Sequence, residues 1–420
     1  MTRVSLSPSI SPSISLMQTS RRHAVAAALL CASIAAVSAS LFQSSTVASQ
    51  VPPPVPRPGE PLPGLTAAQL QAFFDGLDEF TTEETPEGGL GPIFNQKSCV
   101  ACHSSAAPGG ASAVSVTRYG RRLPDGGFDP LSFLGGSLLH TFATRPELQE
   151  VIPRQANVIA KRITTPVFGL GLIEAIPDAA LLDAAAKPKA DGVRGRAAMI
   201  TDVETGQQRV GRLGWKAQHA SVLAFAADAY ANEMGVSNRL FPIQNAPNNR
   251  RDLLAQFNIS TDVEDVVDPA TGLADVDRTV NFMRFLAPLP RRTPDASATA
   301  GQTVFEQTGC ITCHTATLRT GLNAIPALDR KPVPLYSDLL LHDMGSLGDG
   351  IAQGAASPRE MKTAPLWGLA SRPFYLHDGR APTVTMAIQA HDGEARASRD
   401  RFARLPAAQR QQLLDFLRTL

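Results

Sequence analysis

The sequence predicts a mainly α-helical protein that folds as two domains with long structured loops. Apolar residues recur at helical spacing in several segments, and 33 Pro and 32 Gly residues interrupt the chain between them. Aromatic residues make up only 6% of the chain, so another group has to fill part of the core. A length of 420 residues is enough for two cores. A five-residue motif that occurs once in each half supports the division.

The motif is Cys-x-x-Cys-His, at residues 99–103 and again at residues 310–314. Two thiols at this spacing add to the two vinyl groups of one porphyrin, and the adjacent His lies under the iron as its proximal ligand. We therefore predict two covalently bound haem c groups. The attachment residues are Cys99, Cys102, Cys310 and Cys313, and the proximal ligands are His103 and His314. A four-thiolate zinc site would leave both histidines unexplained, and about 200 residues between the pairs does not suit a zinc ribbon.

Residues 1–39 have the features of an export signal. Arg21 and Arg22 precede an apolar run at residues 24–37, and small residues follow at the cleavage position. The run is shorter than a membrane span requires, so we expect no span after signal removal. Residues 40–64 are rich in Ser and Pro and predict an extended tether. We expect a periplasmic protein, and haem c attachment requires this location too. A formal net charge of +1 without a basic run argues against nucleic-acid binding.

An N-terminal haem c domain is predicted over residues 65–287. Periodicity and capping residues predict helices at residues 66–80, 179–186, 221–234 and 275–286. Thr66 is a suitable N-cap for the first helix, and Gly235 is a suitable C-cap for the third. Residues 104–150 are predicted as loops that wrap a haem edge, and residues 201–215 have short β-like character.

Residues 288–295 contain three prolines and predict a linker to a C-terminal domain at residues 296–420. A helix at residues 299–307 leads into the second motif. The last helix, at residues 406–420, starts with Pro and has apolar residues at helical spacing. Small cytochromes c close by packing their last helix on the entry helix. Each half is therefore predicted to be a cytochrome c-like domain.

Four segments carry a family resemblance, at residues 336–345, 362–369, 375–383 and 387–395. They include His-Asp-Gly-Arg at residues 377–380 and His-Asp-Gly-Glu at residues 391–394. Together they resemble the di-haem oxidoreductase family, whose members are described as peroxidase-like or thiol oxidoreductase-like. The chain is more distantly similar to bacterial di-haem cytochrome c peroxidases. It is also similar to the di-haem enzymes that mature methylamine dehydrogenase or cleave rubber.

The resemblance implies a division of labour between the two haems. One is six-coordinate and low-spin, and it stores or relays an electron. The other has an open distal face, where hydrogen peroxide or dioxygen binds. The expected electron partner is a small redox protein. Whether a structural calcium ion lies between the domains is left open.

The distal ligand of the second haem must come from later in the chain. The candidates are His342, Met344, Met361, His377, Met386 and His391. In the di-haem peroxidases that this chain resembles, the ligand follows the His-Asp-Gly motif by about one helix. His391 stands at that place, so we predict ligation by His314 and His391. The alternative for His391 is a helix-end residue bonded to a carboxylate. His377 is predicted to make a structural hydrogen bond, and His342 is ambiguous.

The first haem is predicted to have no strong sixth ligand, although His140 and His219 are alternatives. Glu174 lies in an otherwise apolar run, where burial against a haem would raise its pKa toward that of an acid–base group. The alternative is a Glu that caps a helix or pairs with an Arg such as Arg162. In related di-haem enzymes an aromatic residue lies between the porphyrins. Trp215 is the candidate for that relay, with ordinary haem-pocket packing as the alternative.

These residues predict a periplasmic di-haem oxidoreductase. It would reduce hydrogen peroxide, or use it as an oxidant, at the haem of His103, while the second haem relays or stores electrons. One alternative is a non-catalytic electron carrier with two six-coordinate haems. Another is a dioxygen-activating oxygenase like the rubber-cleaving relatives. A five-coordinate iron would distinguish an enzyme from a carrier.

Overall fold

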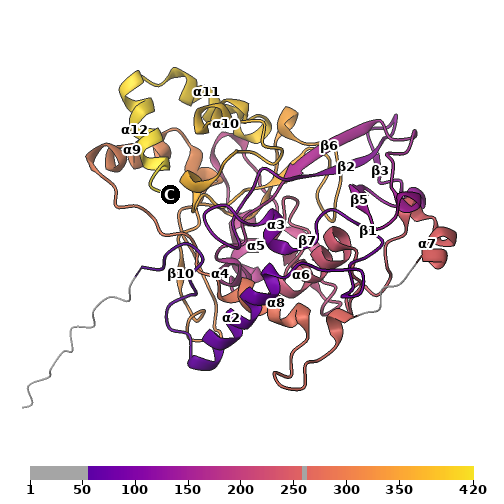
Figure 1. The fold of residues 1–420 in the computed structure, drawn as a ribbon. Helices are drawn as coiled ribbons and strands as arrows, with labels where there is room; N and C mark the ends of the chain where they lie inside the picture. The colour runs from indigo at the N-terminus through magenta and orange to yellow at the C-terminus, as the bar shows by residue number, and fades with distance from the viewer. Residues whose placement is uncertain (1–54, 258–262) are drawn as a thin grey trace, which may run out of the picture. The chain divides into compact units, whose positions relative to one another are not determined.

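The computed structural model describes residues 55–257 and 263–420, in which helices and short strands are joined by long loops (Figure 1). The predicted signal at residues 1–39 lies outside the described residues, and so does most of the predicted tether. Within the described ranges no helix has the length and apolar character needed to cross a membrane.

The first haem motif is positioned by two helices, α2 (Ala67–Thr81) and α8 (Asp275–Phe285). Thr66 caps α2 together with Gln69, so the predicted N-cap is confirmed. Rings on the facing sides of the two helices pack together, with centroids of Phe80 and Phe282 4.7 Å apart. Gly76 permits this approach, because a Cβ there would collide with a backbone carbonyl of α8. The motif follows as the short helix α3 (Cys99–Cys102), with His103 beside Phe80.

The segment predicted as loops, residues 104–150, contains much of an antiparallel sheet, so that prediction is wrong in part. Strand β2 (Ser115–Arg122) pairs along its length with β6 (Val158–Ile163), and the short strands β3 (Phe128–Asp129) and β4 (Leu138–Leu139) also pair with β2. The strands other than β2 and β6 are too short to give a period-2 signal. With five small sheets in the described ranges, the mainly α class is not confirmed.

A helix on the other side of the first motif is α6 (Val222–Ala229), which continues as a π-helical turn at Tyr230–Met234. Gly235 ends it with φ 72°, so the predicted helix and its C-cap are confirmed. The hairpin of β7 (Ala198–Thr201) and β8 (Gln208–Gly211) precedes it and accounts for part of the predicted β-like segment.

The C-terminal helices form the predicted closure. Helix α9 (Ala296–Gln307) packs against α12 (Ala407–Leu417), with the rings of Phe305 and Phe416 5.2 Å apart. Between them in the sequence are α10 (Val384–Ala390) and α11 (Arg396–Arg404), which lie in the same part of Figure 1. The remaining helices are α4 (Leu170–Glu174), α5 (Asp178–Ala186) and α7 (Arg251–Phe257). The remaining strand pairs are β1 (Ile93–Phe94) with β5 (Phe142–Ala143), β9 (Leu318–Arg319) with β10 (Pro332–Val333), and β11 (Leu341–Asp343) with β12 (Glu360–Lys362).

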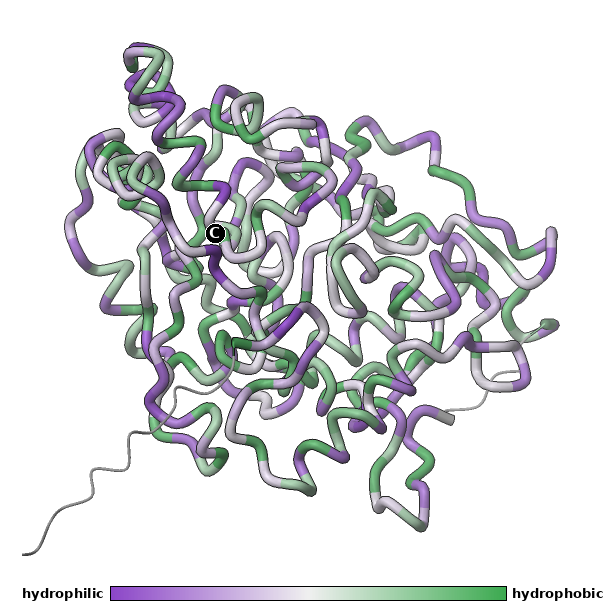
Figure 2. Tube along the Cα trace, turned by 60° about the vertical axis from the view of Figure 1, so that its left-hand side comes forward, coloured by the Kyte–Doolittle hydropathy of each residue, from purple (hydrophilic) through white to green (hydrophobic). Residues whose placement is uncertain are grey.

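The largest apolar cluster takes residues from both sides of the predicted linker. It joins Phe73 and Val280 near the N-terminal helices to Leu335 and Trp367 from beyond residue 295. A separate cluster between α9 and α12 includes Phe305 and other buried residues of the C-terminal helices. Figure 2 shows apolar stretches along the whole described trace, including the loops. The loops that reach across the linker therefore contribute to the core as the helices do.

Candidate functional site

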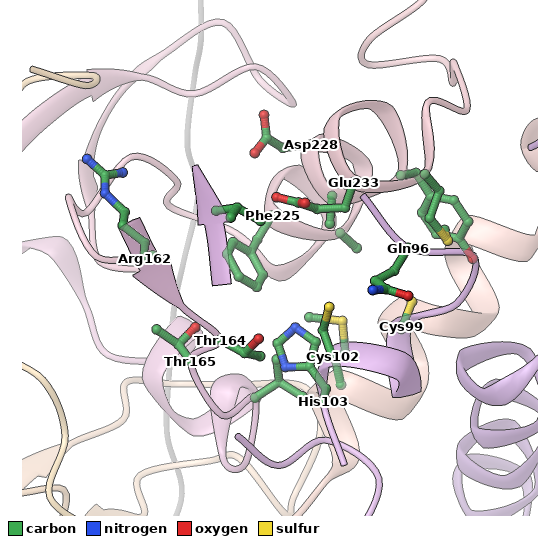
Figure 3. A pocket seen from close by; sticks show the side chains of 18 of the residues that line it. Gln96, Cys99, Cys102, His103, Arg162, Thr164, Thr165, Phe225, Asp228 and Glu233 are labelled. Carbon is green, nitrogen blue, oxygen red and sulfur yellow. The ribbon is translucent and has the colours of Figure 1, made fainter. Parts of the chain in front are cut away.

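The first Cys-x-x-Cys-His motif lines a cavity of about 1110 Å³. Its walls come from the sheet strands β2 and β6, from α6 and its π-helical turn, and from α8. Figure 3 shows Cys102 and His103 at one side of this cavity and Phe225, Asp228 and Glu233 at the other. Burial lowers the pKa of His103 to about 4, so the imidazole is neutral, as an iron ligand must be. The Nδ1 atom of His103 is buried without a hydrogen-bond partner in the described part of the chain.

The second motif lines a cavity of about 1350 Å³, which His314 and His391 share. The Nδ1 of His314 donates to the Tyr336 carbonyl (2.9 Å), and the Nδ1 of His391 donates to the Ala387 carbonyl (2.7 Å). A carbonyl only accepts, so both protons lie on Nδ1 and both Nε2 atoms keep a lone pair for a metal. Burial lowers the pKa of both rings, that of His314 to about 4. These contacts are what a bis-histidine iron needs, and His391 stays the predicted ligand.

Two other histidines, His342 and His377, line the second cavity, and His342 is less suited to ligation. Nδ1 of His342 lies 2.8 Å from Glu394 and Nε2 lies 3.1 Å from Asp338, so both nitrogens are engaged. Burial alone would lower the pKa of His342, but these carboxylates and the Cys313 thiol raise it to about 12. The ring of His377 lies edge-on to Trp215, with centroids 6.3 Å apart.

The three methionines that are candidate ligands of the second haem differ in whether they line the second cavity. Met344 and Met361 line the second cavity, whereas Met386 is exposed and does not. Met344 and Met361 therefore offer thioethers inside the cavity. His391, in contrast, is held by a hydrogen bond that fixes its ring for coordination.

The four motif cysteines are free and line the two cavities. Cys99, Cys102, Cys310 and Cys313 are free thiols and form no disulfides. Burial raises the pKa of Cys102 and of Cys310 to about 12, and both thiols line the cavities beside their motif histidines. Paired structural disulfides are therefore absent at both motifs.

Cationic side chains line both cavities, and some of their nitrogens have no hydrogen-bond partner among the described residues. In the second cavity, burial lowers the pKa of Lys362 to about 8 and that of Arg372 to about 10. Arg372 donates to the Pro365 carbonyl, and its Nε has no partner among the described residues. In the first cavity Arg118 also has an unpartnered Nε. Cationic side chains that are buried away from water need nearby anions, and the two propionates of a haem would supply them. The donor set of each cavity therefore fits a haem.

Trp215 lines both cavities. Its Nε1 donates to the carbonyl of Ile163 (2.9 Å), and the amide of Ile163 donates to the carbonyl of His377 (2.7 Å). The indole is therefore fixed at a wall that the two haem sites share. This placement is what the predicted relay role requires, and packing against a haem is compatible with it as well.

Glu174 lines neither cavity. One oxygen accepts from the Val222 amide (2.7 Å) at the start of α6, and the other accepts from Nε of Arg284 (2.7 Å). The geometry thus favours the alternative of a capping, Arg-paired carboxylate over the predicted acid–base group. The Arg that pairs with Glu174 is Arg284 and not Arg162, which is paired with Asp349 (2.7 Å). The apolar run around Glu174 is buried because α4 packs on α6 and α8.

Two carboxylates that the sequence analysis missed face the first cavity, Asp228 and Glu233 (Figure 3). Nδ2 of Asn95 donates to Oε2 of Glu233 (3.0 Å). Burial raises the pKa of Glu233, and this outweighs the lowering effect of Arg118 and of the Asn95 hydrogen bond. Helical spacing alone does not identify it, because Glu233 lies in the π-helical turn Tyr230–Met234, which changes the helical phase.

His219 and His140 do not line the first cavity. Nε2 of His219 lies 3.2 Å from Asp228, and Nδ1 of His140 lies 2.8 Å from Glu150. Within the described residues, His103 is therefore the one histidine on this cavity. Neither alternative sixth ligand lines this cavity.

A family model described as di-haem oxidoreductase, putative peroxidase, matches residues 146–420. The match includes the second motif and begins after the first. No curated protein sequence matches the chain.

Three solved structures are similar at low identity. Hydrazine synthase of Kuenenia stuttgartiensis is 16% identical, with coverage of 87% of this chain and 95% of that chain and a TM-score of 0.38. The diheme peroxidase BthA of Burkholderia thailandensis E264 is 14% identical, with coverage of 88% and 95% and a TM-score of 0.37. A MauG-like protein associated with microbial copper homeostasis is 17% identical, with coverage of 60% and 89% and a TM-score of 0.30.

Proposed function

Because this chain belongs to the di-haem oxidoreductase family, we propose that it is a periplasmic enzyme that reduces hydrogen peroxide, or uses it as an oxidant, at the haem of its first motif. The observation that carries the proposal is the difference between the two cavities. The second holds two imidazoles with free Nε2 atoms, whereas the first holds one imidazole opposite two carboxylates. One iron would thus be closed and the other open to a small ligand.

The residues that would hold the haems are those of the two cavities. Cys99 and Cys102 would bind the first covalently and His103 would coordinate it. Cys310 and Cys313 would bind the second, between His314 and His391. When bound, the haems supply irons that exchange electrons and, where a face is open, bind an oxidant.

Glu233 is proposed as the group that moves a proton in the first cavity. Its Oε2 is held by Asn95, which leaves Oε1 to accept a proton from peroxide and return it to the departing oxygen. Its raised pKa brings its protonation closer to neutral pH, where a carboxyl group can do both. Glu174 lacks this position, because Arg284 and the α6 amide already hold both of its oxygens.

Trp215 is proposed to carry electrons between the two haem sites, since it is the side chain that both cavities share at their wall. The reductant would be a small redox protein. The export signal predicted at residues 1–39 and the haem c motifs support the periplasmic location.

Steady-state peroxide turnover tests the proposal. Glu233→Gln should lower kcat by about 10²–10⁴-fold, the usual contribution of a positioned acid–base group. Glu174→Gln is the matched control, and it should leave kcat near the wild-type value because that carboxylate lies outside the cavity. Equal turnover by Glu233→Gln and wild type would remove Glu233 from the mechanism. No turnover of peroxide by the wild type with both haems bound would remove the enzyme proposal.

A second candidate function rests on Met234 and Met283, which line the first cavity. Coordination of the first iron by one of these thioethers would close it and leave an electron-transfer cytochrome with two six-coordinate haems. The variants Met234→Leu and Met283→Leu distinguish the functions, because one of them would remove the ligand of a closed first iron and open it, whereas neither would change an open one.

A further inference from the structure

A cluster of acidic residues lies near the first haem motif and is not used by the proposed reaction. It consists of Glu79 on α2, Glu264 on the 3₁₀ turn Val263–Asp265, and Asp275 at the start of α8. One carboxylate oxygen from each lies within 4.8 Å of the others. The packing of α2 on α8 brings Glu79 beside Asp275, and the 3₁₀ turn, which also contacts α8, adds Glu264.

The three carboxylates have unequal partners. Arg278 donates to Oε2 of Glu79 (2.6 Å) and also to Oδ1 of Asp275. Tyr230 lies 3.5 Å from the second oxygen of Glu79. Glu264 is only 1% exposed, and its Oε2 has no hydrogen-bond partner within residues 55–257 and 263–420. The cluster therefore contains a buried carboxylate close to two others, and one of its oxygens has no donor among the described residues.

Among the described residues, Arg278 is the cation that pairs with this cluster, and it contacts Glu79 and Asp275 but is not seen to contact Glu264. A fourth carboxylate, Glu84, is close enough to repel the charges of Glu79 and Glu264. An unpaired carboxylate in such a place is costly unless it is neutralised or bound to a metal.

We propose that Glu264, together with Glu79 and Asp275, binds a hard divalent cation of the calcium type. The donors on offer are carboxylate oxygens alone, which suit Ca²⁺ and Mg²⁺ rather than softer metals. The Arg278 contacts leave Oε1 of Glu79, Oδ2 of Asp275 and the carboxylate of Glu264 for the cation. All three ligands come from residues before the predicted linker, so the site differs from a calcium ion placed between the domains.

The cation would lie close to the first haem. Burial raises the pKa of the Cys99 thiol, and the negative charges of Glu79, Glu264 and Glu84 raise it further. A bound divalent cation would neutralise these negative charges and hold α2, the 3₁₀ turn and α8 together. Its role is structural, and it does not depend on which oxidant the first haem takes.

Calorimetric titration of the EDTA-treated protein with both haems bound tests the site. With CaCl₂ as the probe, we expect one binding event per chain in the wild type and an affinity at least about tenfold lower in Glu264→Gln. Asp265→Asn is the matched control, because Asp265 is the adjacent acid and is paired with Arg239 (3.0 Å). The control should bind like the wild type. A wild type that binds neither Ca²⁺ nor Mg²⁺, or a Glu264→Gln protein that binds like the wild type, overturns the proposal.

Thermal unfolding gives a second readout. At a hundredfold excess of Ca²⁺ over its Kd, the midpoint of the wild type should rise by a few degrees, since binding to the folded state alone stabilises it. The midpoint of Glu264→Gln should not move. If Glu264→Gln does not fold, Glu84→Gln takes its place, with a smaller loss of affinity expected. A calcium response that is the same in Glu84→Gln and the wild type would then contradict the proposal.

Discussion

Removal of the His391 imidazole is the most direct perturbation of the proposed closed iron. His391 ends α10 with its Nδ1 bonded to the Ala387 carbonyl (2.7 Å) and its Nε2 free in the second cavity. His391→Ala takes away the one sixth ligand that the proposal gives to that iron. In the ferric protein the low-spin electron paramagnetic resonance signal, equal to one haem per chain in the wild type, should disappear entirely.

The same substitution should leave the protein folded. The lost hydrogen bond at the end of α10 is worth about 1 kcal/mol, against a typical stability of about 5–15 kcal/mol. Added imidazole should enter the vacated space and restore the low-spin signal, which a merely structural role of His391 would not produce. Met361→Leu is the matched control, since Met361 lines the same cavity and offers the rival thioether. A low-spin signal that survives in His391→Ala and is lost in Met361→Leu would refute the assignment.

Three further outcomes follow from the same geometry. Burial raises the pKa of Glu233, so the fraction of its carboxylate form still increases with pH above the ordinary carboxylate range. Because the carboxylate is the form that accepts a proton, kcat for peroxide should rise over the same pH range. Glu233→Gln should abolish that rise. In stopped-flow measurements Trp215→Phe should slow oxidation of the second haem by peroxide while the reaction of the first haem keeps its rate; equal slowing of both would indicate a packing role. Gly301→Ala should destabilise the chain by about 1–3 kcal/mol, because the new Cβ would collide with the Gln412 carbonyl where α9 meets α12. Chemical denaturation measures that loss, and an unchanged midpoint would show that the two helices can separate.

The sequence was most informative where a local pattern determines the outcome. Cys-x-x-Cys-His identifies its own chemistry, and Thr66 with Gln69 marks the start of α2 because capping depends on residues three apart. The pairing of α9 with α12 followed from periodicity at the two ends of one domain. Each of these predictions needed only neighbouring residues or a familiar closure.

The sequence was least informative where partners are distant. A lone Glu174 in an apolar run indicates burial, but the run does not reveal that Arg284, 110 residues away, holds the carboxylate. Glu233 lies in a π-helical turn that changes the helical phase, so its position on the cavity wall is hard to assign from spacing alone. The sheet of β2 and β6 joins segments about forty residues apart, and strand pairing at that separation leaves little local signal.

The central claim is that the first iron is open and the second is closed by His391. Low-temperature electron paramagnetic resonance of the purified ferric protein, before and after addition of hydrogen peroxide, tests it most directly. The account predicts one high-spin and one low-spin haem per chain, with the high-spin signal consumed by peroxide. Two low-spin signals that do not respond to peroxide, in the oxidised and in the half-reduced protein, would contradict it and identify an electron carrier.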